Sequence, residues 1–232
     1  MPATSPPPEL RHLGILLDGN RRWARRHRLP VSEGHRRGFR RIPDVLGWCE
    51  ESGLEVVSLF MVSDRNARHR PAAELEVLYA TVSEILPRLL TRPAWRLRHI
   101  GVAELLPAPL VAALRDAERG SREGTAMTVN LGIGYGGRAD ILAALRGLLS
   151  APVGSAAALT EDTFGQRLST GGQPDPDLII RTSGELRTSG FLSWQAAQAE
   201  WYFSPKMWPE FDRADFDAAL AAYRERDRRQ GS

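Results

Sequence analysis

Short apolar segments alternate with amphipathic ones along this chain, and this alternation limits the folds that are open to it. Apolar spacing typical of a helix recurs between the apolar segments, as at Leu75, Leu78, Val82, Ile85 and Leu89. The pattern predicts an α/β fold with a single, mostly parallel central sheet and helices flanking both faces. The predicted strands are 12–17, 55–62, 95–100, 126–133, 177–181 and 200–203.

The length and composition favour one domain. With 232 residues, 42% of them hydrophobic, the chain can bury one sizeable core, and we expect a single domain over 12–232. The proline-rich residues 1–11 are interpreted as a disordered lead-in without a signal peptide. No run approaches the roughly 20 apolar residues of a membrane-spanning helix. The Ala, Gly and Ser residues of 151–173 indicate a surface connection, with one short helix beginning near Thr160.

Charge and cysteine content narrow the partners and the compartment. A net charge of +3 suits phosphorylated substrates, and at most peripheral contact with an anionic membrane. No zinc-finger spacing, recognition helix or basic stripe with interleaved aromatic residues supports nucleic acid as a partner. Cys49 is the single cysteine, which excludes an internal disulfide and favours the reducing cytoplasm. Its helical spacing with Phe39, Ile42 and Leu46 predicts a place in the core.

Two arginines and a serine follow the predicted strand 177–181, in what we call the second segment (181–190). Arg181, Arg187 and Ser189 would lie at the carboxyl edge of the sheet, where open α/β folds bind their ligands. The planar fork of a guanidinium suits the oxygens of a diphosphate. A solvated loop with surface arginines is the alternative, and this segment alone leaves both open.

The first segment (18–23) predicts another anion site. The strand 12–17 runs directly into Asp18-Gly-Asn-Arg-Arg-Trp23, which opens a helix, and a strand, a glycine turn and a helix start form a phosphate-binding layout. Gly19 lets the backbone approach a ligand closely. Phosphate would repel Asp18 unless a cation lay between them, which indicates Mg²⁺ held by the carboxylate and the diphosphate together.

Five ordered motifs carry a resemblance to a known family. The chain resembles the cis-prenyltransferases, which include undecaprenyl diphosphate synthase and the short-chain Z-farnesyl diphosphate synthases. The resemblance implies the undecaprenyl diphosphate synthase-like fold and a Mg²⁺-dependent homodimer that condenses isopentenyl diphosphate with an allylic prenyl diphosphate. The motifs are HLGILLDGNRRWA at 12–24, Gly34-His35 with Gly38, Ser63 with Asn66, GYGGR at 134–138, and 177–203 with Trp208-Pro209.

The resemblance also implies a role for individual residues. Asp18 would hold Mg²⁺ and assist ionisation, and Asn66 would serve in proton removal. Glu200 matches a second metal carboxylate, which in relatives reaches a site across the dimer interface. The residues implied to bind the allylic diphosphate are Gly19, Asn20, Arg21, Arg22, Trp23 and His35. Those implied to bind isopentenyl diphosphate are Ser63, Arg181, Arg187, Thr188 and Ser189.

Plainer interpretations of some of these residues stay open, and the chain departs from the family pattern in places. His35 could be an ordinary helix-start residue, and Glu200 an ordinary strand-edge carboxylate. The polar loop 63–71 has Arg65 in place of a carboxylate and Ala67 in place of an aromatic residue, with one residue inserted before its Arg-Pro pair. Many relatives carry arginine where Val31 stands.

The product is expected to be a short prenyl diphosphate of about fifteen carbons. The resemblance implies that the helix between Glu74 and Gly101 lines the hydrocarbon tunnel. Pro87 and Pro93 interrupt this passage, which looks shorter than in long-chain relatives. A long-chain undecaprenyl or decaprenyl diphosphate synthase and a same-fold terpene enzyme with altered prenyl diphosphate chemistry are alternatives. A non-catalytic partner subunit is another, and the retained Asp-Gly-Asn sequence argues against it.

Overall fold

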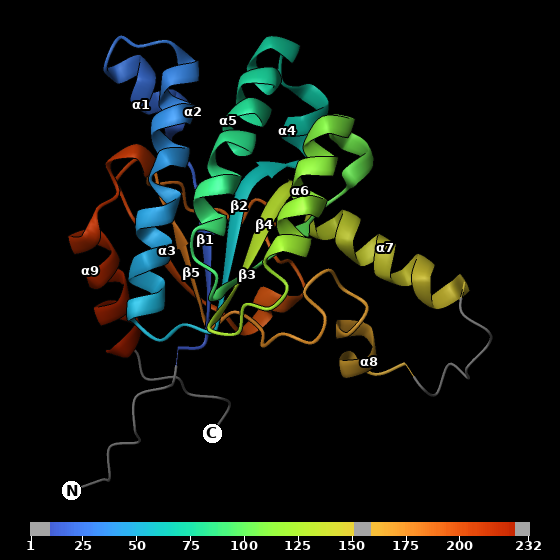
Figure 1. Ribbon diagram of the computed structural model, residues 1–232. Helices are drawn as coiled ribbons and strands as arrows, with labels where there is room; N and C mark the ends of the chain where they lie inside the picture. Colours follow the sequence, from blue (N-terminus) through green and yellow to red (C-terminus); the bar gives the residue numbers. More distant parts are fainter. Residues whose placement is uncertain (1–9, 151–158, 226–232) are drawn as a thin grey trace, which may run out of the picture.

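A computed structural model describes residues 10–150 and 159–225 (Figure 1). Its sheet has six parallel strands in the order β3-β4-β2-β1-β5-β6. All the predicted strands are confirmed, with ends that differ from the prediction by at most two residues. The strands are β1 His12–Leu16, β2 Val56–Ser63, β3 Trp95–Ile100, β4 Met127–Tyr135, β5 Leu178–Arg181 and β6 Glu200–Phe203.

Helices fill most of the connections between the strands. The predicted start of a short helix near Thr160 is confirmed, because Thr160 caps α8 through its side chain. Residues 151–158 of the predicted surface connection lie outside the described residues. The α-helices are α1 Asn20–Arg26, α2 Val31–Arg40, α3 Ile42–Glu51, α4 Asp64–His69, α5 Ala72–Leu90, α6 Ala108–Gly120, α7 Gly137–Ser150, α8 Glu161–Gly165 and α9 Arg213–Arg224. The 3₁₀ helices are η1 Ala103–Leu105, η3 Gln195–Gln198 and η4 Trp208–Glu210.

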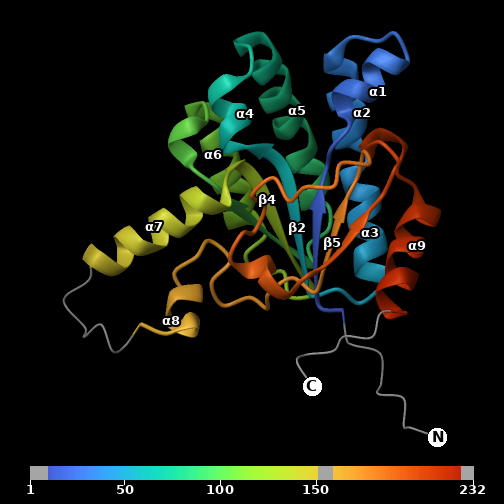
Figure 2. The ribbon, with the colours of Figure 1, turned by 180° about the vertical axis from the view of Figure 1, so that it is seen from behind.

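The two faces of the sheet are covered differently. Strand residues alternate between them: Leu13 and Ile15 face the larger core, which α3, α5, α6 and α9 cover, whereas Leu16 faces a smaller one. Helices were predicted on both faces, but the smaller core is closed mainly by the irregular segment 191–199, with α7 and α8 to one side (Figure 2). The crossover from β5 to β6 passes over this face with only the 3₁₀ helix η3. Cys49 is fully buried in the larger core, as predicted, and burial raises the pKa of its thiol.

The start of the described chain is anchored to the sheet. Leu10 packs against the larger core, and Arg11 forms an ion pair with Glu55 at 2.8 Å. The remaining residues of the predicted lead-in, 1–9, lie outside the described residues. Over the described ranges, no helix combines the length and the apolar character needed to cross a membrane.

Helix α5 corrects one expectation. It continues through Pro87 to Leu90, whereas the sequence indicated that this proline interrupts it. Pro87 lies in the last turn, so it removes only one hydrogen bond of the helix, while Leu86 and Leu89 on the same turn remain buried in the core. Pro93 lies beyond the helix, in the turn that leads to β3.

A buried polar network lies between the strands near their amino ends. His12 Nδ1 is 2.7 Å from the carbonyl oxygen of Pro174, which can only accept, so Nδ1 carries the proton and Nε2 accepts from the Ser58 hydroxyl at 2.8 Å. Asn130 donates to Ser58 Oγ at 2.9 Å and to Gln173 Oε1 at 2.7 Å. Every member is paired, and burial lowers the pKa of His12 to about 4.

The pH dependence of stability should therefore contain a contribution from His12. The unfolded chain binds a proton at this imidazole near the ordinary pKa of 6.5, but the folded chain does so only near 4. The free energy of unfolding should thus be unaffected by His12 above pH 6.5 and should fall by about 3 kcal/mol between pH 6.5 and 4. Urea unfolding of the wild type and His12→Gln at several pH values measures this, because glutamine does not titrate. A stability difference between the two proteins that is constant with pH would contradict it, and His69→Gln shows what the loss of an exposed imidazole does.

Candidate active site

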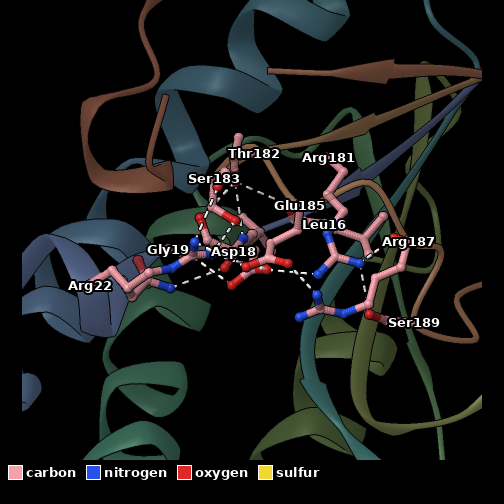
Figure 3. A network of polar contacts seen from close by, with 12 residues as sticks. Leu16, Asp18, Gly19, Arg22, Arg181, Thr182, Ser183, Glu185, Arg187 and Ser189 are labelled. Carbon is pink, nitrogen blue, oxygen red and sulfur yellow. Dashed lines mark hydrogen bonds and ion pairs between the residues drawn. The ribbon is translucent and has the colours of Figure 1, made fainter. Parts of the chain in front are cut away.

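The carboxyl ends of β1 and β5 bring the first and second segments together (Figure 3). The two strands are adjacent and parallel, with Leu16 opposite Arg181. Asp18 therefore lies beside the start of the second segment, although 163 positions separate it from Arg181 in the sequence. The two anion sites predicted separately are parts of one polar network.

Asp18 is the centre of this network. Its carboxylate oxygen Oδ2 accepts from Arg181 Nη2 at 2.8 Å, and Oδ1 accepts from the backbone N–H of Gly19 at 2.7 Å. The Thr182 side chain fixes the backbone of Asp18, because its Oγ1 accepts from the Asp18 N–H at 3.0 Å and lies 2.7 Å from the Asp18 carbonyl oxygen. The Asp18 side chain keeps 36% of its surface exposed, so a ligand can reach the carboxylate.

Arg181 is buried, with a relative exposure of 2%. Besides Asp18, its guanidinium donates to Ser189 Oγ at 2.7 Å and to the backbone carbonyl of Arg187. Its Nε is buried and has no hydrogen-bond partner within the described part of the chain. A buried guanidinium requires a paired anion, which Asp18 supplies in this structure. The predicted surface-loop alternative does not fit Arg181.

A second carboxylate, which the sequence analysis did not single out, links the two segments. Glu185 Oε1 is 3.0 Å from Arg22 Nη1, and Glu185 Oε2 contacts Arg187 Nη1. Arg22 also donates to Ser183 Oγ at 2.6 Å. Glu185 lies within the resembling segment 177–203, so its position carried a signal, but only the folded chain shows that it faces arginines of both segments.

Close packing of α1 against α2 explains two of the glycines in the motifs. A Cβ atom at Gly34 would lie 2.2 Å from the backbone oxygen of Asn20, and one at Gly38 would lie 2.1 Å from Asn20 Oδ1. Asn20 is buried and donates to the Leu17 carbonyl at 3.1 Å, while its Oδ1 has no partner among the described residues. Trp23 is also buried and stacks on His27, with ring centroids 4.4 Å apart, so it supports α1 from within.

His35 belongs to what we call the Glu74 group, in which this imidazole and two arginines surround the carboxylate of Glu74. Glu74 Oε1 accepts from Arg70 at 2.7 Å, lies 3.1 Å from His35 Nε2 and is 3.6 Å from Arg21 Nε. Burial lowers the pKa of His35, whose Nδ1 is enclosed without a partner among the described residues. Burial raises the pKa of Glu74, but the bond from His35 and the charges of Arg70 and Arg21 outweigh it and lower the pKa. Neither Glu74 nor Arg70 was predicted from the sequence to be a site residue.

The predicted polar loop after β2 is partly helical. Ser63 ends the strand and caps α4, because its Oγ accepts from the Asn66 N–H at 3.0 Å. A serine three residues before the N–H it accepts from is an N-cap arrangement, which explains why a helix begins here. Ala67, which stands in place of the family's aromatic residue, packs against the larger core.

Comparison with known proteins identifies the family. A family model described as "Putative undecaprenyl diphosphate synthase" matches residues 16–231. The chain belongs to the undecaprenyl diphosphate synthase family. Its relatives in this family of prenyltransferases include a (2Z,6E)-farnesyl diphosphate synthase of Thermobifida fusca, 42% identical over 99% of this chain and 92% of the relative. A short-chain Z-isoprenyl diphosphate synthase of Mycobacterium leprae is 41% identical over 95% and 87% of the two chains.

A solved structure of similar fold is the lavandulyl diphosphate synthase of Lavandula x intermedia in complex with dimethylallyl diphosphate. It has a TM-score of 0.90 and 32% sequence identity, over 94% of this chain and 96% of the other. The predicted fold class is thereby confirmed as that of the undecaprenyl diphosphate synthase family. Membership in the family also confirms the resemblance inferred from the motifs.

The carboxylates of this family member limit how a metal can be held. Within residues 10–150 and 159–225, no three His, Cys, Asp or Glu side chains are grouped as a complete metal site. Mg²⁺ commonly uses one or two protein carboxylates together with substrate phosphates, and the partly exposed Asp18 fits that role. Glu200 is the first residue of β6 and lies opposite Leu178, the first residue of β5. Arg181 lies three residues further along β5, so Glu200 is about 10 Å, measured along the strands, from the end of the sheet where Asp18 lies.

Gly19 should be required for the backbone conformation of the first segment. Gly19 has a φ angle of +105°, and a Cβ atom there would lie 3.0 Å from the Met207 side chain and 3.1 Å from that of Ser183. Gly19→Ala should therefore lower the free energy of unfolding by about 1–3 kcal/mol, as measured by urea denaturation. The control Gly47→Ala, in α3, meets no atom within 4 Å and should leave stability unchanged or raise it by up to about 1 kcal/mol. Equal stability of Gly19→Ala and wild type would refute the strain.

Proposed function

We propose that this protein condenses isopentenyl diphosphate with an allylic prenyl diphosphate and releases inorganic diphosphate and a short Z-prenyl diphosphate of about fifteen carbons. The observation that carries the proposal is the network in which Asp18 lies between arginines of two segments, at the edge of the sheet where α/β enzymes bind ligands. The names of the relatives support it, since two of those described above are short-chain Z-prenyl diphosphate synthases.

The first segment is assigned to the allylic diphosphate. Arg22, which is 42% exposed, would donate to the phosphate oxygens while it keeps its contact with Glu185, and Arg21 would turn toward them from the edge of the Glu74 group. Gly19 and Asn20, at the start of α1, would let the diphosphate approach the backbone closely. Trp23, buried in the same helix, would hold this turn in place. His35 would donate through Nε2, which would exchange Glu74 for a phosphate oxygen.

The second segment is assigned to isopentenyl diphosphate. Arg187 and Thr188 are exposed there, while Arg181 and Ser189 are already bonded to each other at 2.7 Å. Ser63 and Asn66, which begin α4 at the end of β2, would complete this site, with Asn66 in the proton removal that follows condensation. Holding both diphosphates side by side converts the bimolecular attack of one substrate on the other into an effectively unimolecular step.

Asp18 is assigned to Mg²⁺, with the ion held jointly by its carboxylate and diphosphate oxygens. When bound there, Mg²⁺ would offset the negative charge that builds up on the departing diphosphate. Asp18 Oδ2 is paired with Arg181 in this structure, so its carboxylate would exchange that partner as the substrate site fills.

We also propose a homodimer. Glu200 lies at the amino end of β6, one of the two edge strands of the sheet, and all residues of β6 are partly exposed. Because β6 has a neighbouring strand on one side only, a second copy packed against it is the occupant we assign. Glu200 would then serve the partner's metal site, because its own Asp18 lies at the other end of the strands.

Two alternatives are distinguished by the chemistry of the product. A non-catalytic subunit would not need the Asp18-centred network, which is intact here. A same-fold enzyme with altered prenyl diphosphate chemistry is suggested by the lavandulyl diphosphate synthase structure, but its 32% identity is below the 41–42% of the Z-prenyl relatives. We therefore favour ordinary condensation.

Activity should require Mg²⁺ and the Asp18 carboxylate. Asp18→Ala and Asp18→Asn should each lower kcat a hundredfold or more, equivalent to about 3 kcal/mol, because both remove the charge that holds the cation. The asparagine variant keeps the shape of the side chain and separates loss of charge from loss of packing. Steady-state rates with and without excess chelator test this, and full turnover by either variant or in chelator would rule out the metal role.

Arg187 should act on isopentenyl diphosphate far more than on the allylic substrate. Its side chain is 64% exposed, so Arg187→Ala leaves no buried carboxylate unpaired, which makes it a cleaner variant than one at the buried Arg181. We expect the KM for isopentenyl diphosphate to rise at least about tenfold, with poor rescue by Arg187→Lys because a point charge lacks the fork. A rise confined to the allylic KM would show that the two sites are assigned in reverse.

Product length is the direct test of the function. The inner side of α5, formed by Leu78, Val82, Ile85 and Leu89, is almost fully buried, so a growing tail must displace close packing to pass along it. Overpacking of this kind costs about 1–3 kcal/mol, which should stop elongation near fifteen carbons. Labelled isopentenyl diphosphate is incubated with dimethylallyl, geranyl or farnesyl diphosphate, and the dephosphorylated products are separated by chromatography. A ladder to about fifty carbons would indicate a long-chain enzyme, and branched products an altered chemistry.

A further inference from the structure

We propose that Glu185 couples the two diphosphate sites, so that filling one site strengthens binding at the other. The coupling presupposes the proposed function, because both ligands are substrates of that reaction. Glu185 is a positioning residue in this scheme: it holds an arginine of each site and does not itself contact a reacting atom.

The geometry points to Glu185 because its two oxygens are divided between the sites (Figure 3). Oε1 is 3.0 Å from Arg22 Nη1, in the first segment, and Oε2 contacts Arg187 Nη1, in the second. The Glu185 side chain is 28% exposed, whereas those of Arg22 and Arg187 are 42% and 64% exposed. The carboxylate is thus the most buried member of the three.

A fixed turn directs Glu185 toward both arginines. Ser183 and Gly184 have φ angles of +83° and +71°, and such a conformation is costly for a serine. Their N–H groups donate to the backbone of the neighbouring 204–206 segment, at 2.6 and 2.9 Å. Ser183 Oγ also accepts from Arg22 at 2.6 Å, so the turn and Arg22 hold each other in place.

The physical consequence is shared ordering. Among the described residues, Glu185 is the single carboxylate paired with Arg187, which otherwise extends into solvent. A diphosphate bound at Arg22 immobilises Arg22 and, through it, Glu185 and Arg187. The second diphosphate then binds an Arg187 side chain that has already lost its conformational entropy, so its own binding costs less free energy. Because coupling is reciprocal, the second ligand must strengthen the first to the same degree.

The test measures binding without turnover. Isothermal titration calorimetry gives the Kd of isopentenyl diphosphate with and without a sulfur-bridged allylic diphosphate, which cannot ionise. In the wild type the analogue should lower this Kd by a factor of about five or more. In Glu185→Gln the factor should fall below about two, because a neutral amide cannot hold two guanidiniums. Glu185→Asp keeps the charge but is one methylene shorter, and it should also lose the coupling.

A control variant and two contrary outcomes distinguish failure of the coupling through Glu185 from failure of the proposed prenyltransferase function. Glu55→Gln removes an exposed carboxylate that pairs with Arg11 at 2.8 Å near the amino edge of the sheet, and it should keep the wild-type factor. An unchanged factor in Glu185→Gln, or no coupling in the wild type, overturns the role of Glu185 while diphosphate binding stands. Failure of the wild type to bind either diphosphate overturns the proposed function, and the coupling with it.

Discussion

The ion pair between Asp18 and Arg181 is the interaction on which the rest of the site depends. It joins the ends of two adjacent parallel strands, and it neutralises a guanidinium that is almost completely buried. An unpaired charge at that depth would cost several kcal/mol, so the two segments are held in register by electrostatics as well as by the sheet. Arginines 22 and 187 are arranged around this pair and reach the surface.

The network also holds opposite charges close together. Asp18 and Glu185 pair with Arg22, Arg181 and Arg187, so the three cations are only partly neutralised and attract an anion. Strained backbone at Ser183 and Ser189, with φ angles of +83° and +53°, keeps the second segment folded back toward the first. Preorganisation of this kind lowers the cost of binding two diphosphates together.

The amino ends of the strands contribute to stability, whereas the carboxyl ends carry the candidate site. The larger core of α3, α5, α6 and α9 fixes the strands, and the buried network of His12, Ser58 and Asn130 pairs their polar groups near the amino ends. The carboxyl ends are thereby free to carry charged loops. Glu74 extends this charged region to α5 and binds Arg70 and His35, which ties α2 to the helix that lies over the core.

The sequence by itself determined the strands, the helix start at Thr160 and the family, because apolar periodicity, capping residues and short motifs are local signals. It also identified Asp18, Arg181, Arg187 and Ser189 as candidates, since their residue types follow strand ends. Tertiary structure decided which of them meet. The pairing of β1 with β5 brings Asp18 to Arg181, the turn at Ser183 places Glu185 between two arginines, and the direction of β6 leaves Glu200 at the far end. Contacts between residues more than 150 positions apart depend on strand order, and no local pattern encodes that order.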